Sequence, residues 1–323
     1  MASGHEPAGQ GANRPDLLGL TDSVNPRCSK PTGLLMIDSK QMVTHDRATA
    51  SRNRCSGAVG ASFSTIDLGL ADVDPVVKAL TDQQAETAIV LDGVTIAEAD
   101  RATRCIGWSV ADVLLHLAQS DEMAIASLTD GFGTAAVDNT SGWGGGTSVD
   151  ESVAVMVERE RGAPFEDVLN GWRLAAAGLV ATLGGMDLST RVPWVAGNLS
   201  ARTLATTRLS ETWIHTQDIA DAIGVDLVPS DRLKLIARLA WRTLPYAFHS
   251  SGLTMTGPVA FRLIGPSGEQ WEFVPDEPEV TTISGSAVDL CAVAARRIDP
   301  AATTLAGEGP DVADVLALVR TYA

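Results

Sequence analysis

Helical periodicity is the feature that most constrains how this chain can fold. Apolar side chains recur at three- and four-residue spacing through most of the stretch from residue 72 to residue 248, which is typical of amphipathic helices. Turn residues such as Asp92-Gly93 interrupt the pattern. We expect helices over about 72–92, from 109 onward, over 151–183 with an interruption near Pro164, over 201–223 and over 230–248. The stretch 130–150, rich in Gly, Thr and Ser, is predicted to be a long loop.

Two of these helices carry capping residues. Ser109 is a predicted N-cap, and Asp112 stands three residues later, as in a capping box. Gly224 follows the helix over 201–223 at the position where glycine commonly ends a helix.

The pattern changes after about residue 250. Residues 259–264 and 270–274 are strand candidates around the turn Gly265-Pro-Ser-Gly268, and 280–283 is a third. Helices are expected over about 287–297 and 310–322. We therefore expect a mainly α chain with a helical bundle over 67–250 and a small α/β domain over 251–323. Residues 1–66, rich in Gly, Ser, Ala, Asn and Pro, are interpreted as a disordered extension.

Charge and composition exclude several functions. The net charge of −16 argues against nucleic acid or an anionic membrane as the partner. No apolar run has the length of a membrane span, and the N-terminus lacks the pattern of a secretory signal. The four scattered cysteines fit a reducing compartment. The composition therefore predicts a cytoplasmic protein without a nucleic-acid or membrane partner, which leaves a small-molecule substrate open, and the sequence allows a monomer or a homodimer.

A narrow polar stripe runs along the predicted helix over 201–223. Arg208, Glu211, His215 and Asp218 fall within an arc of about 80° on a helix that is apolar on most other sides. A solvated face is normally wider, so this stripe indicates polar groups pointing into a bundle. A metal is one way to compensate such buried charge. A Glu and a His at this spacing also occur together on many exposed helix surfaces.

Two motifs carry a family resemblance. Trp-Ser-Val-x-Asp-x-x-x-His-Leu at 108–117 and Glu-Thr-Trp-x-His-x-x-Asp-Ile-Ala-Asp-Ala-x-Gly at 211–224 resemble the DinB/YfiT-like superfamily, and more closely its mycothiol-dependent maleylpyruvate isomerase-like branch. The resemblance covers about 72–323. It implies a DinB-like four-helix bundle followed by a small SCP2-like α/β domain. It also implies a divalent metal, commonly Zn²⁺, held by His116, Glu211 and His215.

The resemblance further implies thiol chemistry. Relatives activate mycothiol at the metal, and the thiolate then adds to an electrophile, giving isomerisation or S-transfer. Two imidazoles and one carboxylate leave a coordination position open for such chemistry. The resemblance brings an arginine of the C-terminal domain to the site, with Arg296 and Arg297 as candidates, while Asp218 or Arg208 could orient a ligand.

Two other functions remain open on the sequence. One is a hydrolase that uses a metal-activated water without a thiol, and the other is a metal-binding protein without catalysis. The chain shows no convincing nucleophilic cysteine of its own, because Cys105 lies just before a predicted helix and Cys291 lies in an apolar segment. An external thiol therefore fits better than an internal one.

Overall fold

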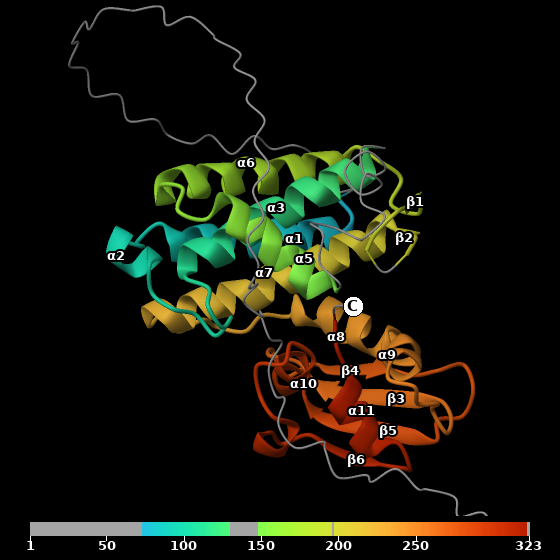
Figure 1. The fold of residues 1–323 in the computed structure, drawn as a ribbon. Coiled ribbons are helices and arrows are strands. Elements are labelled where there is room, and N and C mark those ends of the chain that lie inside the picture. Colours follow the sequence, from blue (N-terminus) through green and yellow to red (C-terminus); the bar gives the residue numbers. More distant parts are fainter. Residues whose placement is uncertain (1–72, 130–147, 196, 322–323) are drawn as a thin grey trace, which may run out of the picture.

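A computed structural model describes residues 73–129, 148–195 and 197–321. The predicted disordered extension over 1–66 and nearly all of the predicted loop over 130–150 lie outside these residues. The described chain is mainly helical, with a small sheet region near its C-terminus (Figure 1). Among the described residues, no helix is both long enough and apolar enough to cross a membrane.

Four long helices make up most of the first half: α1 (Pro75–Leu91), α3 (Val110–Leu128), α6 (Phe165–Gly184) and α7 (Ala201–Ile223). They lie side by side, with α3 packed on α6 and α7, and α1 packed on α7 and α6 (Figure 1). The shorter α5 (Val149–Glu160) packs on α3, and α2 (Ile96–Ala99) follows α1. This packing sets α3 and α7, which carry the candidate ligands, against each other.

Local sequence explains where these helices begin and end. Ser109 and Asp112 form the predicted capping box at the start of α3. Gly224 ends α7 in the left-handed conformation, with φ of 79°, which favours glycine because a Cβ is strained there. The predicted bounds of α7 are confirmed. The predicted helical region over 151–183 is two helices, α5 and α6, and the predicted interruption near Pro164 is confirmed, because α6 begins at Phe165.

The C-terminal part is a mixed sheet covered by short helices. Its strands are β3 (Val259–Ile264), β4 (Gln270–Phe273), β5 (Thr281–Ser286) and β6 (Ala306–Glu308), in the order β4-β3-β5-β6. The predicted hairpin is the antiparallel pair β3 and β4, whereas β3 and β5 are parallel. The helices are α10 (Ala287–Ala294) and α11 (Val312–Leu318), both shorter than predicted, and a 3-10 turn, η2, covers Pro300–Ala302.

Three details differ from the sequence expectation. The helix expected over 230–248 is broken at Thr243 into α8 (Leu233–Arg242) and α9 (Leu244–Ser250), because Pro245 begins a new helix rather than continuing one. A short hairpin that was not predicted, formed by β1 (Arg191–Val192) and β2 (Leu199–Ser200), precedes α7. Strand β6 was not predicted, because its three exposed residues show no apolar alternation.

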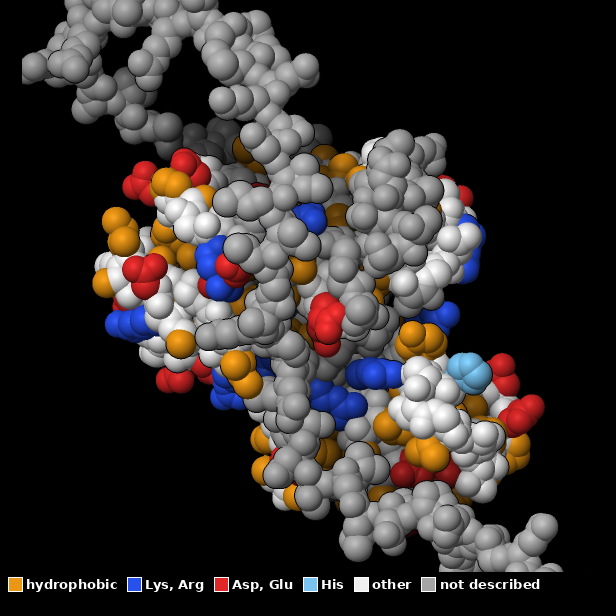
Figure 2. All heavy atoms as spheres, viewed as in Figure 1, with side chains coloured by type: hydrophobic (Ala, Val, Ile, Leu, Met, Phe, Trp, Pro, Cys, Tyr) orange, Lys and Arg blue, Asp and Glu red, His pale blue; other side chains and the backbone are white. Residues whose placement is uncertain are grey.

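Helix α8 joins the two parts of the molecule. It packs on α7 on one side and on α10 and β4 on the other (Figure 1). A single cluster of buried apolar side chains accordingly continues from α1 and α7 into the sheet, where Phe261 and Trp271 are fully buried. Basic side chains gather along the junction between the helices and the sheet on the face seen in Figure 2. The predicted boundary near residue 250 stays a prediction.

Candidate metal centre

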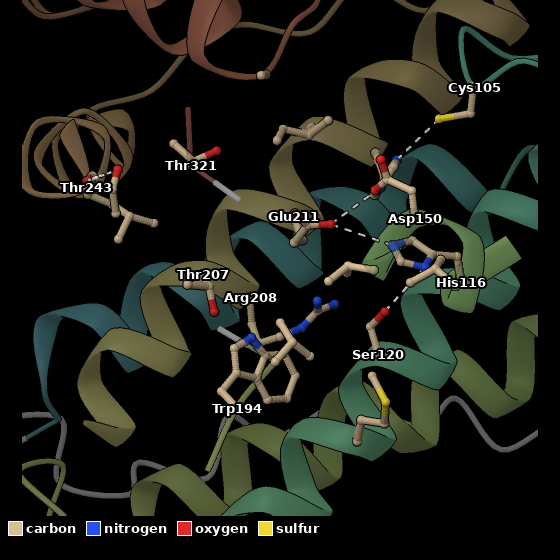
Figure 3. A pocket seen from close by; sticks show the side chains of 18 of the residues that line it. Cys105, His116, Ser120, Asp150, Trp194, Thr207, Arg208, Glu211, Thr243 and Thr321 are labelled. Carbon is tan, nitrogen blue, oxygen red and sulfur yellow. Dashed lines mark hydrogen bonds and ion pairs between the residues drawn. The ribbon is translucent and has the colours of Figure 1, made fainter. Parts of the chain in front are cut away.

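Side chains from α3 and α7 meet at one point between the helices. The Nε2 atoms of His116 and His215 each lie 3.6 Å from Glu211 Oε2. The two imidazoles meet edge to face, with ring centroids 4.9 Å apart. Figure 3 shows Glu211 and His116 pointing toward each other. The structure thus brings together the three residues that the resemblance implies as ligands.

The opposite nitrogens of both histidines are held by neighbouring polar groups. His215 Nδ1 lies 3.0 Å from Asp218 Oδ2, and His116 Nδ1 lies 3.3 Å from Ser120 Oγ. Such contacts fix the orientation of each ring and leave Nε2 directed at Glu211. Asp218, one of the two residues that the sequence suggested for orienting a ligand, therefore lies against His215, whereas Ser120 was not anticipated.

Burial and mutual contact shift the pKa values of these groups. Burial lowers the pKa of His116 to about 4. Burial opposes ionisation of Glu211, but its close contacts with the two histidines outweigh burial and hold its pKa well below the ordinary value. Burial also opposes protonation of His215, yet Asp218 and other neighbours raise its pKa well above the ordinary value. The centre therefore favours one proton on His215 and a charged Glu211.

This donor set fits a divalent cation. Nitrogen and carboxylate atoms that can act as ligands lie within 4.8 Å of one another in the group His116, Glu211 and His215. The distance of 3.6 Å from each histidine Nε2 to Glu211 Oε2 is longer than a hydrogen bond. It leaves room for an ion between these atoms, because each ligand atom would lie about 2.0–2.2 Å from a shared Zn²⁺. Two imidazoles with one carboxylate are a zinc-type set that leaves a position open.

Arg297 reaches this centre from the C-terminal part. Its Nε and Nη2 each lie 2.7 Å from a different oxygen of Asp218, so the contact is bidentate. Asp218 in turn holds His215, and its pKa is therefore far below the ordinary value despite its burial. The other arginine candidate, Arg296, has a left-handed backbone with φ of 59° and is not among the pocket-lining residues that the structure describes.

Cys105 lies beside the site, which sequence reasoning did not anticipate. Its sulfur is 3.5 Å from Asp218 Oδ2 and 3.9 Å from His215 Nδ1, and these three residues form a second group of potential ligand atoms. A lone cysteine before a helix offers no spacing signal, so only the fold could reveal this placement. Cys291 is fully buried in α10, and burial raises the pKa of its thiol, in agreement with a structural role.

Arg208 does not contact the three candidate ligands through any described hydrogen bond. Its Nε donates to Asp121 Oδ1 of α3 at 2.9 Å, and the two side chains are 3% and 0% exposed. Burial raises the pKa of Asp121, and the adjacent guanidinium opposes that shift. Arg208 therefore holds α7 to α3 from the wall of the site.

A cavity of about 370 Å³ opens onto the centre (Figure 3). Its walls are largely apolar, with Trp108 packed at 5.3 Å from the His116 ring. Asp150 of α5 also lines it, and burial together with the charge of Glu211 raises the pKa of Asp150. The arrangement offers a ligand-sized space beside a set of potential metal ligands.

The chain resembles several known proteins. Residues 80–220 match the family model of the mycothiol maleylpyruvate isomerase N-terminal domain. Two uncharacterized proteins from two strains of Mycobacterium tuberculosis are each 32% identical over 263 residues, covering 79% of this chain and 97% of the relative. Crystal structures of mycothiol-dependent maleylpyruvate isomerase and of a point mutant align with a TM-score of 0.48 at 21% identity, over 73% of this chain and 95% of theirs.

The family match spans the helices that carry both halves of the centre, from α1 through α7. The mycobacterial relatives extend the similarity over most of the chain. The chain therefore belongs to the family that carries the mycothiol maleylpyruvate isomerase N-terminal domain.

Proposed function

We propose that this protein is a divalent-metal enzyme that activates a low-molecular-weight thiol, mycothiol, for isomerisation or S-transfer on an electrophilic small molecule. The observation that carries the proposal is the convergence of His116, Glu211 and His215 on one point at the edge of an apolar cavity. Zn²⁺ is the metal that this ligand set suits best. When bound, it would lower the pKa of a thiol in the open position.

The proposal includes a fold assignment. Helices α1, α3, α6 and α7 correspond to a DinB-like four-helix bundle within residues 67–250, and residues 251–323 to an SCP2-like α/β domain. In this arrangement the bundle supplies the ligands and the C-terminal part supplies Arg297. A cytoplasmic location belongs to the same proposal.

The chain's own residues would position the reacting groups. Asp218 accepts from His215 Nδ1 and keeps that ring directed at Glu211. Arg297 holds both oxygens of Asp218 and places a guanidinium at the cavity wall. The apolar walls exclude water, which protects a thiolate from protonation and strengthens electrostatic interactions within the cavity.

The test combines metal analysis with thiol binding. We expect about one Zn²⁺ per chain in purified protein, little in the H116A/E211A/H215A variant, and mycothiol binding only to the metal-loaded protein. His249→Ala is the matched control, because this exposed histidine in α9 lies outside the cavity lining and its loss should leave metal content unchanged.

Three results would separate the alternatives. Full metal content in the triple variant would refute the ligand assignment. Metal-dependent ester or amide hydrolysis without any thiol would favour the hydrolase. Tight metal binding without mycothiol binding would favour a metal-binding protein that lacks catalysis.

A further inference from the structure

The positive charges of the arginines that line the cavity are all paired within the protein. Three arginines line the cavity, and each is held by a carboxylate of the protein. The pairs, with their shortest described contacts, are Arg104 with Asp221 at 2.7 Å, Arg297 with Asp218 at 2.7 Å and Arg208 with Asp121 at 2.9 Å. Among the lining residues that the structure describes, no lysine or further arginine adds positive charge.

Negative charge at the cavity is not offset in this way. Glu211 and Asp150 both line the cavity, and neither is the described partner of one of these arginines. A divalent cation at the proposed centre would offset these two charges, and a thiolate would bring one negative charge more. An anionic substrate would then enter a largely apolar space without a compensating charge, which is strongly unfavourable.

One hydrogen-bond donor in the wall has no partner. Arg208 is only 2% exposed. Its Nη2 atom is buried and makes no hydrogen bond with the described residues. Figure 3 shows its guanidinium reaching into the space between Glu211, Ser120 and Trp194. An unsatisfied buried donor is costly, so an oxygen acceptor on a ligand would be favoured there.

We propose that the substrate is an uncharged carbonyl compound with an apolar body, whose carbonyl oxygen accepts a hydrogen bond from Arg208 Nη2. The apolar body lies against the aliphatic and aromatic walls, which include Met123, Trp194 and Leu199. The inference rests on the proposed function for the identity of the reaction, but its binding preference can be measured without any reaction.

The test uses two unreactive probes of equal shape, benzylacetone and hydrocinnamate, which differ by a methyl ketone against a carboxylate. Calorimetric titration of each into the metal-loaded full chain, with mycothiol present so that a carboxylate does not take the open metal position, should show the ketone binding about tenfold or more tightly. The D121N/R208Q variant removes both charges of the pair, which avoids a lone buried ion, and should lose about tenfold in ketone affinity. The matched control D92N/R173Q alters an exposed pair whose residues do not line the cavity, and it should retain ketone affinity.

Equal or tighter binding of hydrocinnamate would show that one arginine carries an uncompensated charge, and would overturn the inference. Unchanged ketone affinity in D121N/R208Q, or no binding of either probe, would also overturn it. Metal content and mycothiol binding measured on the same sample keep the two proposals apart. If they fail while the ketone preference holds, only the proposed function fails.

Discussion

At the scale of single residues, Asp218 connects the candidate metal centre to the rest of the molecule. It is fully buried and contacts both His215 Nδ1 and the Arg297 guanidinium. We expect Asp218→Asn to weaken Zn²⁺ affinity by roughly 10–100-fold, because the ring of His215 loses its charged partner. Competition with a chromophoric chelator measures this change.

The control for this prediction lies three residues away on the same helix. Asp221→Asn removes a half-exposed carboxylate that pairs with Arg104 and touches no candidate ligand. Its Zn²⁺ affinity should stay within about twofold of the unaltered protein, as expected for a screened surface charge. If Asp218→Asn and Asp221→Asn lost Zn²⁺ affinity equally, Asp218 would have no specific supporting role.

Protonation at the centre gives a second prediction at this scale. The raised pKa of His215 leaves it protonated at neutral pH in the metal-free protein, whereas the pKa of about 4 leaves His116 neutral. Metal binding at pH 7 should therefore release about one proton, and the apparent affinity should rise about tenfold per pH unit until His215 is deprotonated. Titration calorimetry in buffers of different ionisation enthalpy counts the protons. Release of none would contradict the protonation assigned to His215.

At the scale of secondary structure, the start of α3 tests how far local sequence determines a helix. The Ser109 hydroxyl accepts from Asp112 N, and the Asp112 carboxylate accepts from Ser109 N. Ser109→Ala should lower the free energy of unfolding by about 1 kcal/mol, whereas Ser109→Thr, which keeps an accepting oxygen, should cost much less. Urea unfolding followed by circular dichroism measures both. A Thr variant as unstable as the Ala variant would show that the cap is not responsible.

The sequence could predict the elements whose signals are local, and it missed those that depend on distant parts of the chain. Capping residues and strong periodicity are local signals, so the capping box of α3 and the bounds of α7 are confirmed. Strand β6 depends on pairing with β5, at Ser284 with Ala306 and at its neighbours. That pairing is created by the sheet rather than by the segment's own residues.

The residues of the candidate site divide in the same way, into those that the sequence could place and those that only the fold brings together. Helical spacing alone places Glu211 and His215 on one face, and the family resemblance adds His116. The fold alone brings Cys105 within 3.9 Å of His215, and it selects Asp121 as the partner of Arg208. These contacts join segments about 87 to 110 residues apart, for which one sequence contains no spacing signal.

At the scale of the whole molecule, two arginines join the C-terminal part to the helices. Arg297, which follows α10, pairs with Asp218, whose side chain is 0% exposed. Arg104, which precedes α3, donates to the Arg297 carbonyl oxygen and pairs with Asp221, with both side chains about half exposed. The two ion pairs have similar distances but different burial. A comparison of them therefore shows how burial alone changes the contribution of an ion pair to the free energy of unfolding.

We therefore expect unequal losses of stability. Arg297→Met should lower the free energy of unfolding by about 1.5–3 kcal/mol, because it leaves the buried Asp218 without charge-assisted hydrogen bonds. Arg104→Met should cost less than about 1 kcal/mol, since solvent screens an exposed pair. Urea unfolding of both variants at matched ionic strength measures the difference. If the loss in Arg297→Met were no larger than that in Arg104→Met, the contact with Asp218 would not hold the C-terminal part against α7, and Arg297 would act only as a group at the cavity wall.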